Sequence, residues 1–236
     1  MKFEIIKVYL RLLKYRNGKA YYSETGEDAV IEQIFANEIG KYVDVGASHP
    51  IIGNNTYKFY KRGWKGIGIE PIKTYEKLWK IARPKDKFFQ GVVSDSMDDV
   101  EFVEFSNSLL SSTDKALIEE HKRRGIASIQ YSVKAISLKN LLPEKLSPNE
   151  PYLVSIDVEG AELTVLKTIN FNQQRPRVIL IESWSLPWEK KNKAISYLEN
   201  HASYQLFAYT GLTAVMVPSE IMKRVRGLRA KLENLD

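Results

Sequence analysis

Short apolar runs alternate with segments of helical periodicity along most of this 236-residue chain. Five runs are rich in β-branched residues and nearly continuous in apolar character, as buried strands are. These predicted core strands span residues 42–45, 66–69, 88–93, 152–156 and 178–181. Helical spacing or helix-favouring composition predicts helices around them at residues 28–37, 74–82, 161–168 and 190–200. The alternation predicts a doubly wound α/β fold, in which helices cover both faces of a parallel sheet.

Two segments depart from this alternation between the third and fourth core strands. Residues 99–105 and 129–136 alternate like half-exposed strands, and they flank a Ser-rich stretch at 106–112 and a polar helix at about 115–124. We interpret the whole as an insertion of the kind that builds a substrate lid, with a simple surface loop at 106–112 as the alternative.

The last two predicted strands form a hairpin. Residues 204–209 and 212–217 are apolar and are joined by Thr210-Gly211, a tight-turn signal. Added to the five core strands, they predict a seven-stranded sheet whose last strand is antiparallel.

Charge is concentrated at the two ends of the chain. The formal net charge is +6, but residues 1–19 hold six basic side chains against one acid, and residues 219–236 hold five against three. Residues 20–218 therefore carry 24 basic and 25 acidic side chains, a net charge of −1. This body does not have the basic excess of a nucleic-acid cleft, so we expect nucleic acid to be an improbable partner.

The two tails predict basic helices at residues 1–19 and 219–236, on either side of one domain at 20–218. In the first tail, Phe3, Ile6 and Leu10 recur at helical spacing with basic residues on other faces. Such a helix either lies on an anionic membrane surface or a partner subunit, or covers its own domain; the second interpretation is favoured. The oligomeric state stays open.

Composition narrows the chemistry and the compartment. The chain has no Cys, which excludes disulfides, Cys-bound zinc, iron–sulfur clusters and a thiol nucleophile. No secretory signal or membrane span is visible, because charges interrupt every long apolar stretch. We expect a cytoplasmic protein, with peripheral membrane contact through the basic tails as the alternative.

A cofactor site is predicted where the first core strand ends. The strand runs through Asp44 into a small-residue turn at Gly46 and Ala47, and Gly there lets a ligand approach the backbone closely. Glu70 ends the second strand 26 positions after Asp44, where an acid hydrogen-bonds a ribose diol. Together these residues indicate an adenosine-containing cofactor.

The glycine pattern favours S-adenosylmethionine over a dinucleotide. Gly46 is not followed by the further glycines of a G-x-G-x-x-G motif, and Asp44 would repel phosphates. At the tip of the third predicted strand, Ser94 and Asp95 offer a hydroxyl and a carboxylate suited to an adenine amino group. Each acid taken alone could equally be a helix cap or turn residue.

Candidate catalytic residues follow the fourth strand. Asp157 and Glu159 would share one side of an extended backbone, and one of them could accept a proton from an attacking hydroxyl. Alternatively, Asp157, Glu159 and Glu182 at the fifth strand's tip could hold a divalent metal, although carboxylate clusters are more often hydrogen-bonding networks. His49, beside the glycine turn, is either a second candidate base or a residue that holds its loop.

These motifs resemble the FkbM-type S-adenosylmethionine-dependent methyltransferases over about residues 20–218. The matching blocks are Ser23-Glu-Thr-Gly-Glu-Asp28, Val43-Asp-Val-Gly-Ala47, Asn55-Thr-Tyr57, Gly68-Ile-Glu-Pro71 and Ser155-Ile-Asp-Val-Glu-Gly-Ala-Glu162. Glu24 departs from the pattern, because the family usually carries Gln there. The resemblance implies a Rossmann-like class I methyltransferase, and it favours a cofactor contact for Glu27, which could instead cap the first core helix.

The resemblance also implies O-methylation of a hydroxyl on a sugar, glycan or other small metabolite. Two alternatives stay open at this stage. A ribose 2′-O-methyltransferase would use the basic tails to hold a phosphate backbone. A non-catalytic module would keep the fold and lose turnover, against which the intact run of acids argues.

Overall fold

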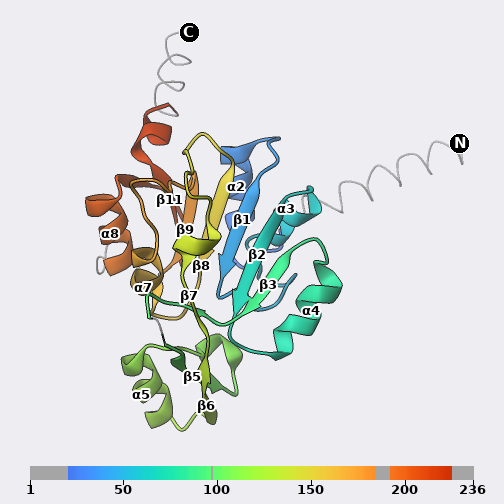
Figure 1. Ribbon diagram of the computed structural model, residues 1–236, viewed down its shortest axis with the longest axis vertical. Coiled ribbons are helices and arrows are strands. Elements are labelled where there is room, and N and C mark those ends of the chain that lie inside the picture. The colour runs from blue at the N-terminus through green and yellow to red at the C-terminus, as the bar shows by residue number, and fades with distance from the viewer. Residues whose placement is uncertain (1–20, 97, 184–191, 225–236) are drawn as a thin grey trace, which may run out of the picture.

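The computed structural model describes residues 21–96, 98–183 and 192–224, and its centre is a seven-stranded sheet with the order β10-β11-β9-β8-β1-β2-β3 (Figure 1). The strands are β1 (Lys41–Val45), β2 (Lys65–Glu70), β3 (Lys87–Gln90), β8 (Tyr152–Ile156), β9 (Val178–Glu182), β10 (Tyr204–Thr210) and β11 (Thr213–Pro218). β11 is antiparallel to both of its neighbours, whereas β9, β8, β1, β2 and β3 are parallel. The predicted sheet with its antiparallel last strand is confirmed.

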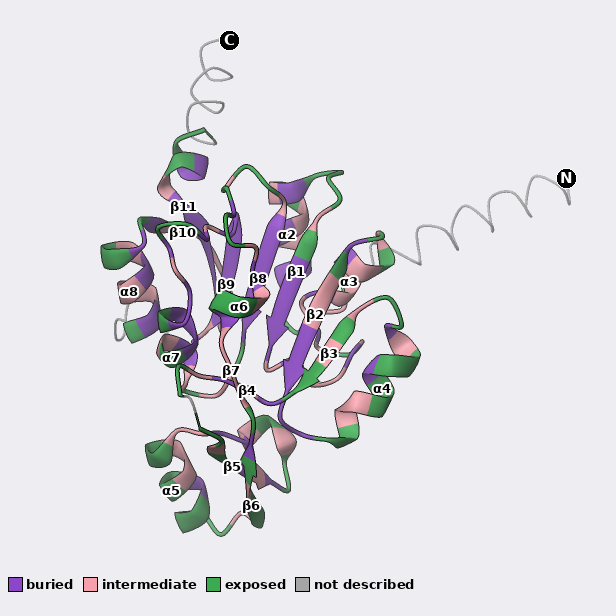
Figure 2. Cartoon of the chain, in the orientation of Figure 1, coloured by how far each residue is buried: buried purple, intermediate pink, exposed green. Residues whose placement is uncertain are grey.

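Helices cover both faces of this sheet (Figure 2). They are α2 (Glu27–Phe35), α3 (Tyr57–Lys61), α4 (Thr74–Ala82), α6 (Leu138–Leu141), α7 (Glu162–Lys167) and α8 (Lys193–His201). Side chains alternate along each strand, so Leu153 packs with α2 and α3 while its neighbour Val154 packs with α7 and α8 on the opposite face. Both are completely buried, which explains why the core strands read as continuous apolar runs.

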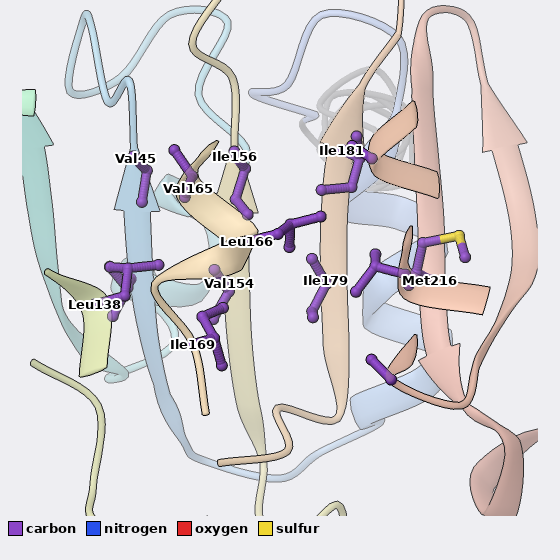
Figure 3. Packing of buried hydrophobic residues seen from close by; sticks show 14 of the residues in the cluster. Val45, Leu138, Val154, Ile156, Val165, Leu166, Ile169, Ile179, Ile181 and Met216 are labelled. Carbon is purple, nitrogen blue, oxygen red and sulfur yellow. The ribbon is translucent and has the colours of Figure 1, made fainter. Parts of the chain in front are cut away.

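Figure 3 shows the face that α7 covers. Leu166 of α7 is fully buried against Ile156 of β8 and Ile179 of β9. Each fully buried aliphatic side chain contributes about 1.5–3 kcal/mol relative to an exposed one. This packing holds α7, which begins after residues 157–161, against the carboxyl ends of β8 and β9.

The third predicted strand differs from the structure. Residues 88–93 are divided into β3, which belongs to the main sheet, and β4 (Val92–Val93), which pairs in parallel with β7 (Ala135–Ile136) outside it. The division falls at Gly91, where a Cβ atom would lie 2.5 Å from the backbone oxygen of Lys134. The returning chain therefore approaches the strand too closely for any side chain at this position.

The predicted insertion begins after β4 and ends at β7. It contains the antiparallel pair β5 (Val100–Phe105) and β6 (Ser128–Val133), the short helix η1 (Ser108–Leu110) and helix α5 (Lys115–Arg123). Phe102 and Val133 pack on Ile72, which follows β2, in a small core of their own. In Figure 1 the insertion lies beside the carboxyl ends of the central strands.

The predicted N-terminal helix at 1–19 lies outside the described residues, as does most of the C-terminal one. Residues 219–224 are helical, and Ile221 and Met222 are buried against the α2 side of the sheet. Among the helices that the structure describes, none is long and apolar enough to cross a membrane.

Candidate active site

A cavity opens at the carboxyl ends of β1, β2 and β8, and the insertion forms one of its walls. It contains about 700 Å³ of space, part of which is open to solvent. Most of the lining side chains are apolar, and the carboxylates of Glu70, Asp157 and Glu159 are placed among them. Apolar walls with a few convergent polar groups are typical of sites for small ligands, and this position is the switch point of a doubly wound sheet.

The turn after β1 brings two strand ends into contact. Gly46 has φ +74°, and a Cβ atom on it would lie only 1.6 Å from the backbone oxygen of Asp157. The backbone N–H groups of Gly46 and Ala47 donate to the carbonyl of Ile69 at 3.0 and 3.1 Å. Gly46 lines the cavity, whereas Ala47 is buried behind it. Glycine is therefore required here for close packing of the strands around the cavity.

Glu70 ends β2 inside the cavity wall. Its two carboxylate oxygens accept hydrogen bonds from the backbone N–H groups of Ser48 (3.0 Å) and Ile72 (2.9 Å). Burial raises the pKa of Glu70 to about 7, although these two hydrogen bonds oppose the rise. The charges of Asp157 and Glu104 raise it further. The predicted ribose-binding acid thus lies where a bound adenosine could reach it.

Asp44 is completely enclosed beneath the loop that follows the glycine turn. Its carboxylate accepts hydrogen bonds from Thr56 Oγ1 (2.7 Å) and Asn54 Nδ2 (3.0 Å). Burial raises its pKa, and the positive charge of Arg83 opposes the rise. Asp44 does not belong to the cavity lining, so its contact with a cofactor stays a prediction. In the structure it holds the loop in place.

Arg83 is a buried residue that the sequence did not single out. Its Nε donates to Asp86 Oδ2 at 2.8 Å, Nη1 to Asn54 Oδ1 at 2.9 Å, and Nη2 to Thr56 Oγ1 at 2.9 Å. The guanidinium also lies 4.0 Å from the ring centre of Trp79. We call this group the Arg83 network; its members are Asp44, Asn54, Thr56, Arg83 and Asp86. No periodicity or motif marks Arg83, because two of its three side-chain partners, Asn54 and Thr56, are distant in sequence.

Three carboxylates lie together at the tips of β8 and β9. Asp157, Glu159 and Glu182 each offer an oxygen within 4.8 Å of the other two, and we call them the acid cluster. Glu182 Oε2 is buried and has no hydrogen-bond partner among the described residues. The structure therefore brings together the residues that the sequence suggested either as a base or as metal ligands.

Asp157 and Glu182 are close enough for each carboxyl group to shift the pKa of the other. Solvent reaches Asp157 through the cavity, but the surrounding protein still desolvates its carboxyl group. Desolvation raises the pKa of both acids, and the charge of Asp157 raises that of Glu182 further. The pKa of Glu182 is raised further than that of Asp157, so Glu182 is the protonated acid of the pair, and Asp157 lines the cavity together with Glu159.

His49 and Glu27 lie in local hydrogen bonds outside the cavity lining. His49 Nδ1 accepts hydrogen bonds from the backbone N–H groups of Ile51 (3.2 Å) and Ile52 (3.0 Å), as the loop-holding interpretation expects. Glu27 begins α2, and its carboxylate accepts from the backbone N–H of Thr25 at 3.0 Å and from the hydroxyl of Thr25. A catalytic role for His49 and a cofactor contact for Glu27 stay predictions.

Ser94 and Asp95 follow β4 and are likewise absent from the cavity lining. Ser94 is half-buried and Asp95 is exposed. Their expected position rested on a third strand that continued to Val93, but β3 ends at Gln90. Val92 and Val93 themselves do line the cavity. Contact between Ser94 or Asp95 and an adenine ring stays a prediction.

A family model described as the methyltransferase FkbM domain matches residues 44–206. The chain belongs to the FkbM methyltransferase family. This FkbM domain includes the glycine turn, Glu70, the insertion and the whole acid cluster. The match confirms the family that the motifs around Asp44 and Asp157 indicated.

Comparison with solved structures finds matches at low sequence identity. Monomeric WbdD is 12% identical with a TM-score of 0.45, and the match covers 86% of the FkbM-family chain and 43% of WbdD. A TehB-like SAM-dependent methyltransferase from Corynebacterium glutamicum is 11% identical with a TM-score of 0.40, covering 91% and 96% of the two chains. The 1,6-didemethyltoxoflavin-N1-methyltransferase of Burkholderia thailandensis, solved with S-adenosylhomocysteine, is 10% identical with a TM-score of 0.40, covering 92% and 87%.

The FkbM-family chain thus spans less than half the length of WbdD. Among curated proteins, none matches this chain.

Proposed function

We propose that the protein transfers a methyl group from S-adenosylmethionine to a hydroxyl oxygen of a sugar, glycan or other small metabolite. The observation that carries the proposal is the distribution of acids along one cavity. Glu70 lines the cavity at the end of β2, Asp157 and Glu159 line it after β8 with Glu182 beside them, and most of the other lining side chains are apolar. A ligand with a ribose at one end and positive charge at the other complements this arrangement.

The described residues fit S-adenosylmethionine. Glu70 would accept hydrogen bonds from the ribose hydroxyls, and Val92, Val93 and Phe102 would enclose the adenine. The methionine arm would then extend past Gly46 towards Asp157. The bound molecule supplies an electrophilic methyl group on a positively charged sulfur, and negative carboxylates at this end favour that charge.

Asp157 is our candidate for the general base. It faces the cavity, and its pKa, raised to about 6, keeps it largely ionised at neutral pH while making it a better proton acceptor than an ordinary aspartate. As the acceptor oxygen takes the methyl group, its hydroxyl proton passes to the Asp157 carboxylate. The electrons of the broken carbon–sulfur bond stay with sulfur, so charge and atoms balance.

A divalent cation in the acid cluster is the second mechanistic candidate. The carboxylates of Asp157, Glu159 and Glu182 are close enough to bind one ion, and Glu182 Oε2, which has no hydrogen-bond partner within the described part of the chain, would be one of the ligands. An ion there would displace the proton of Glu182 and would lower the pKa of an acceptor hydroxyl. Turnover that is lost with a chelator and restored by Mg²⁺ would select this mechanism.

Acceptor class can be tested by salt dependence. The body of the chain carries a net charge of −1, which favours a neutral sugar or metabolite over nucleic acid. Binding of a polynucleotide would weaken steeply between low and high salt, whereas binding of a neutral acceptor would not. A steep salt dependence would support the ribose 2′-O-methyltransferase alternative.

The deciding experiment is calorimetric titration of the full chain with S-adenosylmethionine and S-adenosylhomocysteine, with NAD as the negative control. We expect both sulfur ligands to bind, and Glu70→Ala to weaken them by tenfold or more because the ribose loses its hydrogen-bond acceptor. Acceptor screening with labelled S-adenosylmethionine would follow. Failure of both sulfur ligands to bind, or tighter binding of NAD, would refute the proposed function; binding without turnover on any acceptor would support the non-catalytic alternative.

A further inference from the structure

The insertion is hydrogen-bonded to the turn at residues 157–160, which carries Asp157 and Glu159 of the acid cluster. Ser112 lies between η1 and α5, is only 1% exposed, and donates from Oγ to the backbone oxygen of Glu159 at 2.6 Å. The same Oγ accepts a hydrogen bond from the backbone N–H of Asp114 at 2.8 Å. Backbone bonds of 3.1 Å in both directions tie Ser112 to Val103 of β5. The hydroxyl therefore connects the frame of the insertion to the acid-bearing turn.

This turn has an unusual backbone that needs support. Glu159 has φ +50° and Gly160 has φ +99°, and the left-handed region is unfavourable for a residue with a side chain such as Glu159. Glu162, the first residue of α7, accepts a hydrogen bond at Oε1 from the N–H of Gly160 at 2.9 Å. A Cβ on Gly160 would lie 2.8 Å from Leu117 Cδ1, so α5 packs closely against the turn. The turn is thus held between α7 and the insertion.

The position of the turn decides where Asp157 and Glu159 present their carboxylates. Both residues line the cavity and follow the carboxyl end of β8. A shift of the turn would move the negative charges at this end and leave the hydrogen bonds of Glu70 to backbone N–H groups in place. The two ends of a bound ligand would then respond differently to a change at Ser112.

We propose that Ser112 is a positioning residue for the methyl-donor end of the site, acting through the backbone oxygen of Glu159. The proposal rests on the proposed function, because it concerns how S-adenosylmethionine is held. In this proposal the insertion is part of the cofactor site. The segment that we expect to cover the acceptor would also position the carboxylates of Asp157 and Glu159, which would face the sulfonium and ammonium groups of S-adenosylmethionine.

The test compares two ligands that share an adenosine end. S-adenosylmethionine has the charged amino-acid arm, and 5′-methylthioadenosine lacks it. Dissociation constants are measured by calorimetry for the wild type, Ser112→Ala and Ser112→Thr, which retains the hydroxyl. We expect Ser112→Ala to weaken S-adenosylmethionine fivefold or more and 5′-methylthioadenosine less than twofold, and Ser112→Thr to restore most of the loss.

Tyr131→Phe is the matched control inside the insertion. It removes a hydrogen bond of 2.6 Å from the Tyr131 hydroxyl to Glu104 Oε2, which joins β6 to β5 and does not touch the acid-bearing turn. We expect the ratio of the two dissociation constants to stay at the wild-type value in this variant. If Ser112→Ala does not fold, as judged by circular dichroism, Ser112→Cys takes its place, because a thiol is a weaker donor of similar size.

The outcomes separate the two proposals. Equal weakening of both ligands by Ser112→Ala would show that Ser112 only supports the fold, and unchanged binding would show that it has no role; either result overturns the positioning role. Failure of the wild type to bind S-adenosylmethionine would refute the proposed function, and the positioning role with it. Selective loss of S-adenosylmethionine binding, with rescue by Ser112→Thr and no change of ratio in Tyr131→Phe, would establish it.

Discussion

The Arg83 network and the acid cluster both place carboxylates inside the protein, and they differ in how the charge is balanced. In the network, the buried guanidinium of Arg83 bonds Asp86 and two residues that bond Asp44. In the acid cluster, the carboxyl groups lie beside one another, and among the described residues no Lys or Arg forms an ion pair with Asp157 or Glu182. The first group holds a loop, and the second places the carboxylates of Asp157 and Glu159 at the cavity. Here the buried carboxylates that have a cationic partner have a structural role, and Asp157 and Glu182, which have none in the described part of the chain, mark the candidate reactive site.

The largest expected change in the free energy of unfolding comes from removing the positive charge of Arg83 from the Arg83 network. Arg83→Met should destabilise the fold by about 3–5 kcal/mol, because it leaves Asp86 and Asp44 buried without their cation. Urea denaturation followed by circular dichroism measures this loss. Stability within about 1 kcal/mol of the wild type would show that the network does not carry the loop.

Removing an acid from the cluster should affect activity and spare stability. Asp157→Asn should lower methyl transfer by about 10²–10⁴-fold through loss of the base. Its free energy of unfolding should change by less than about 1 kcal/mol, because a repelled carboxylate is replaced by a neutral amide. Turnover is measured on the acceptor found by screening, and unfolding by the same urea titration. A variant that kept wild-type turnover would exclude Asp157 as the base.

Glu70 offers an intermediate case, because it has backbone partners and no buried cation. Its pKa is about 7 in the folded protein against 4.5 for an ordinary glutamate, so the folded state binds the proton more tightly than the unfolded chain. Its contribution to stability is complete below about pH 4.5 and is lost as the pH rises through about 7. Glu70→Gln should therefore reduce the fall in stability across that interval. Urea midpoints at several pH values test this, and a slope identical to that of the wild type would contradict it.

The smallest effect is expected at a charge pair on the surface. Lys80 Nζ lies 2.6 Å from Glu76 Oε1 on α4, and its side chain is 68% exposed. Lys80→Met should change the free energy of unfolding by less than about 0.5 kcal/mol, because water and salt screen an exposed pair. The urea denaturation of Lys80→Met is measured together with that of Arg83→Met, because both variants replace a cationic side chain with Met. If Lys80→Met lost as much stability as Arg83→Met, burial would not explain the difference between the two ion pairs.

Sequence periodicity predicted the architecture well because the sheet is buried on both faces. The α4 helix has the predicted bounds, and β8 does as well. The break at Gly91 was not predicted, since it depends on the backbone of Lys134, which is distant in sequence. Glycine within an apolar run was the available signal.

The site was predictable in type and less so in detail. Glu70 and the acid cluster were found because strand ends meet at one edge of a parallel sheet. For Asp44, the acid at the strand end was identified, but not the loop residues Asn54 and Thr56 that bond it. Arg83 and Ser112 act through contacts across the fold, which spacing along one chain does not encode.

The parallel pair of β4 and β7 has a consequence for how such a protein can diversify. Val92 pairs with Ala135 and Val93 with Ile136, so the chain leaves and rejoins the core at one closed stem. Segments of other lengths could be exchanged between these two points without shifting the register of the main sheet. The insertion can therefore be exchanged as a unit at the β4–β7 pair. A replacement with a hydroxyl at the position of Ser112 could keep the methyl-donor site that we propose and present a different surface to the acceptor.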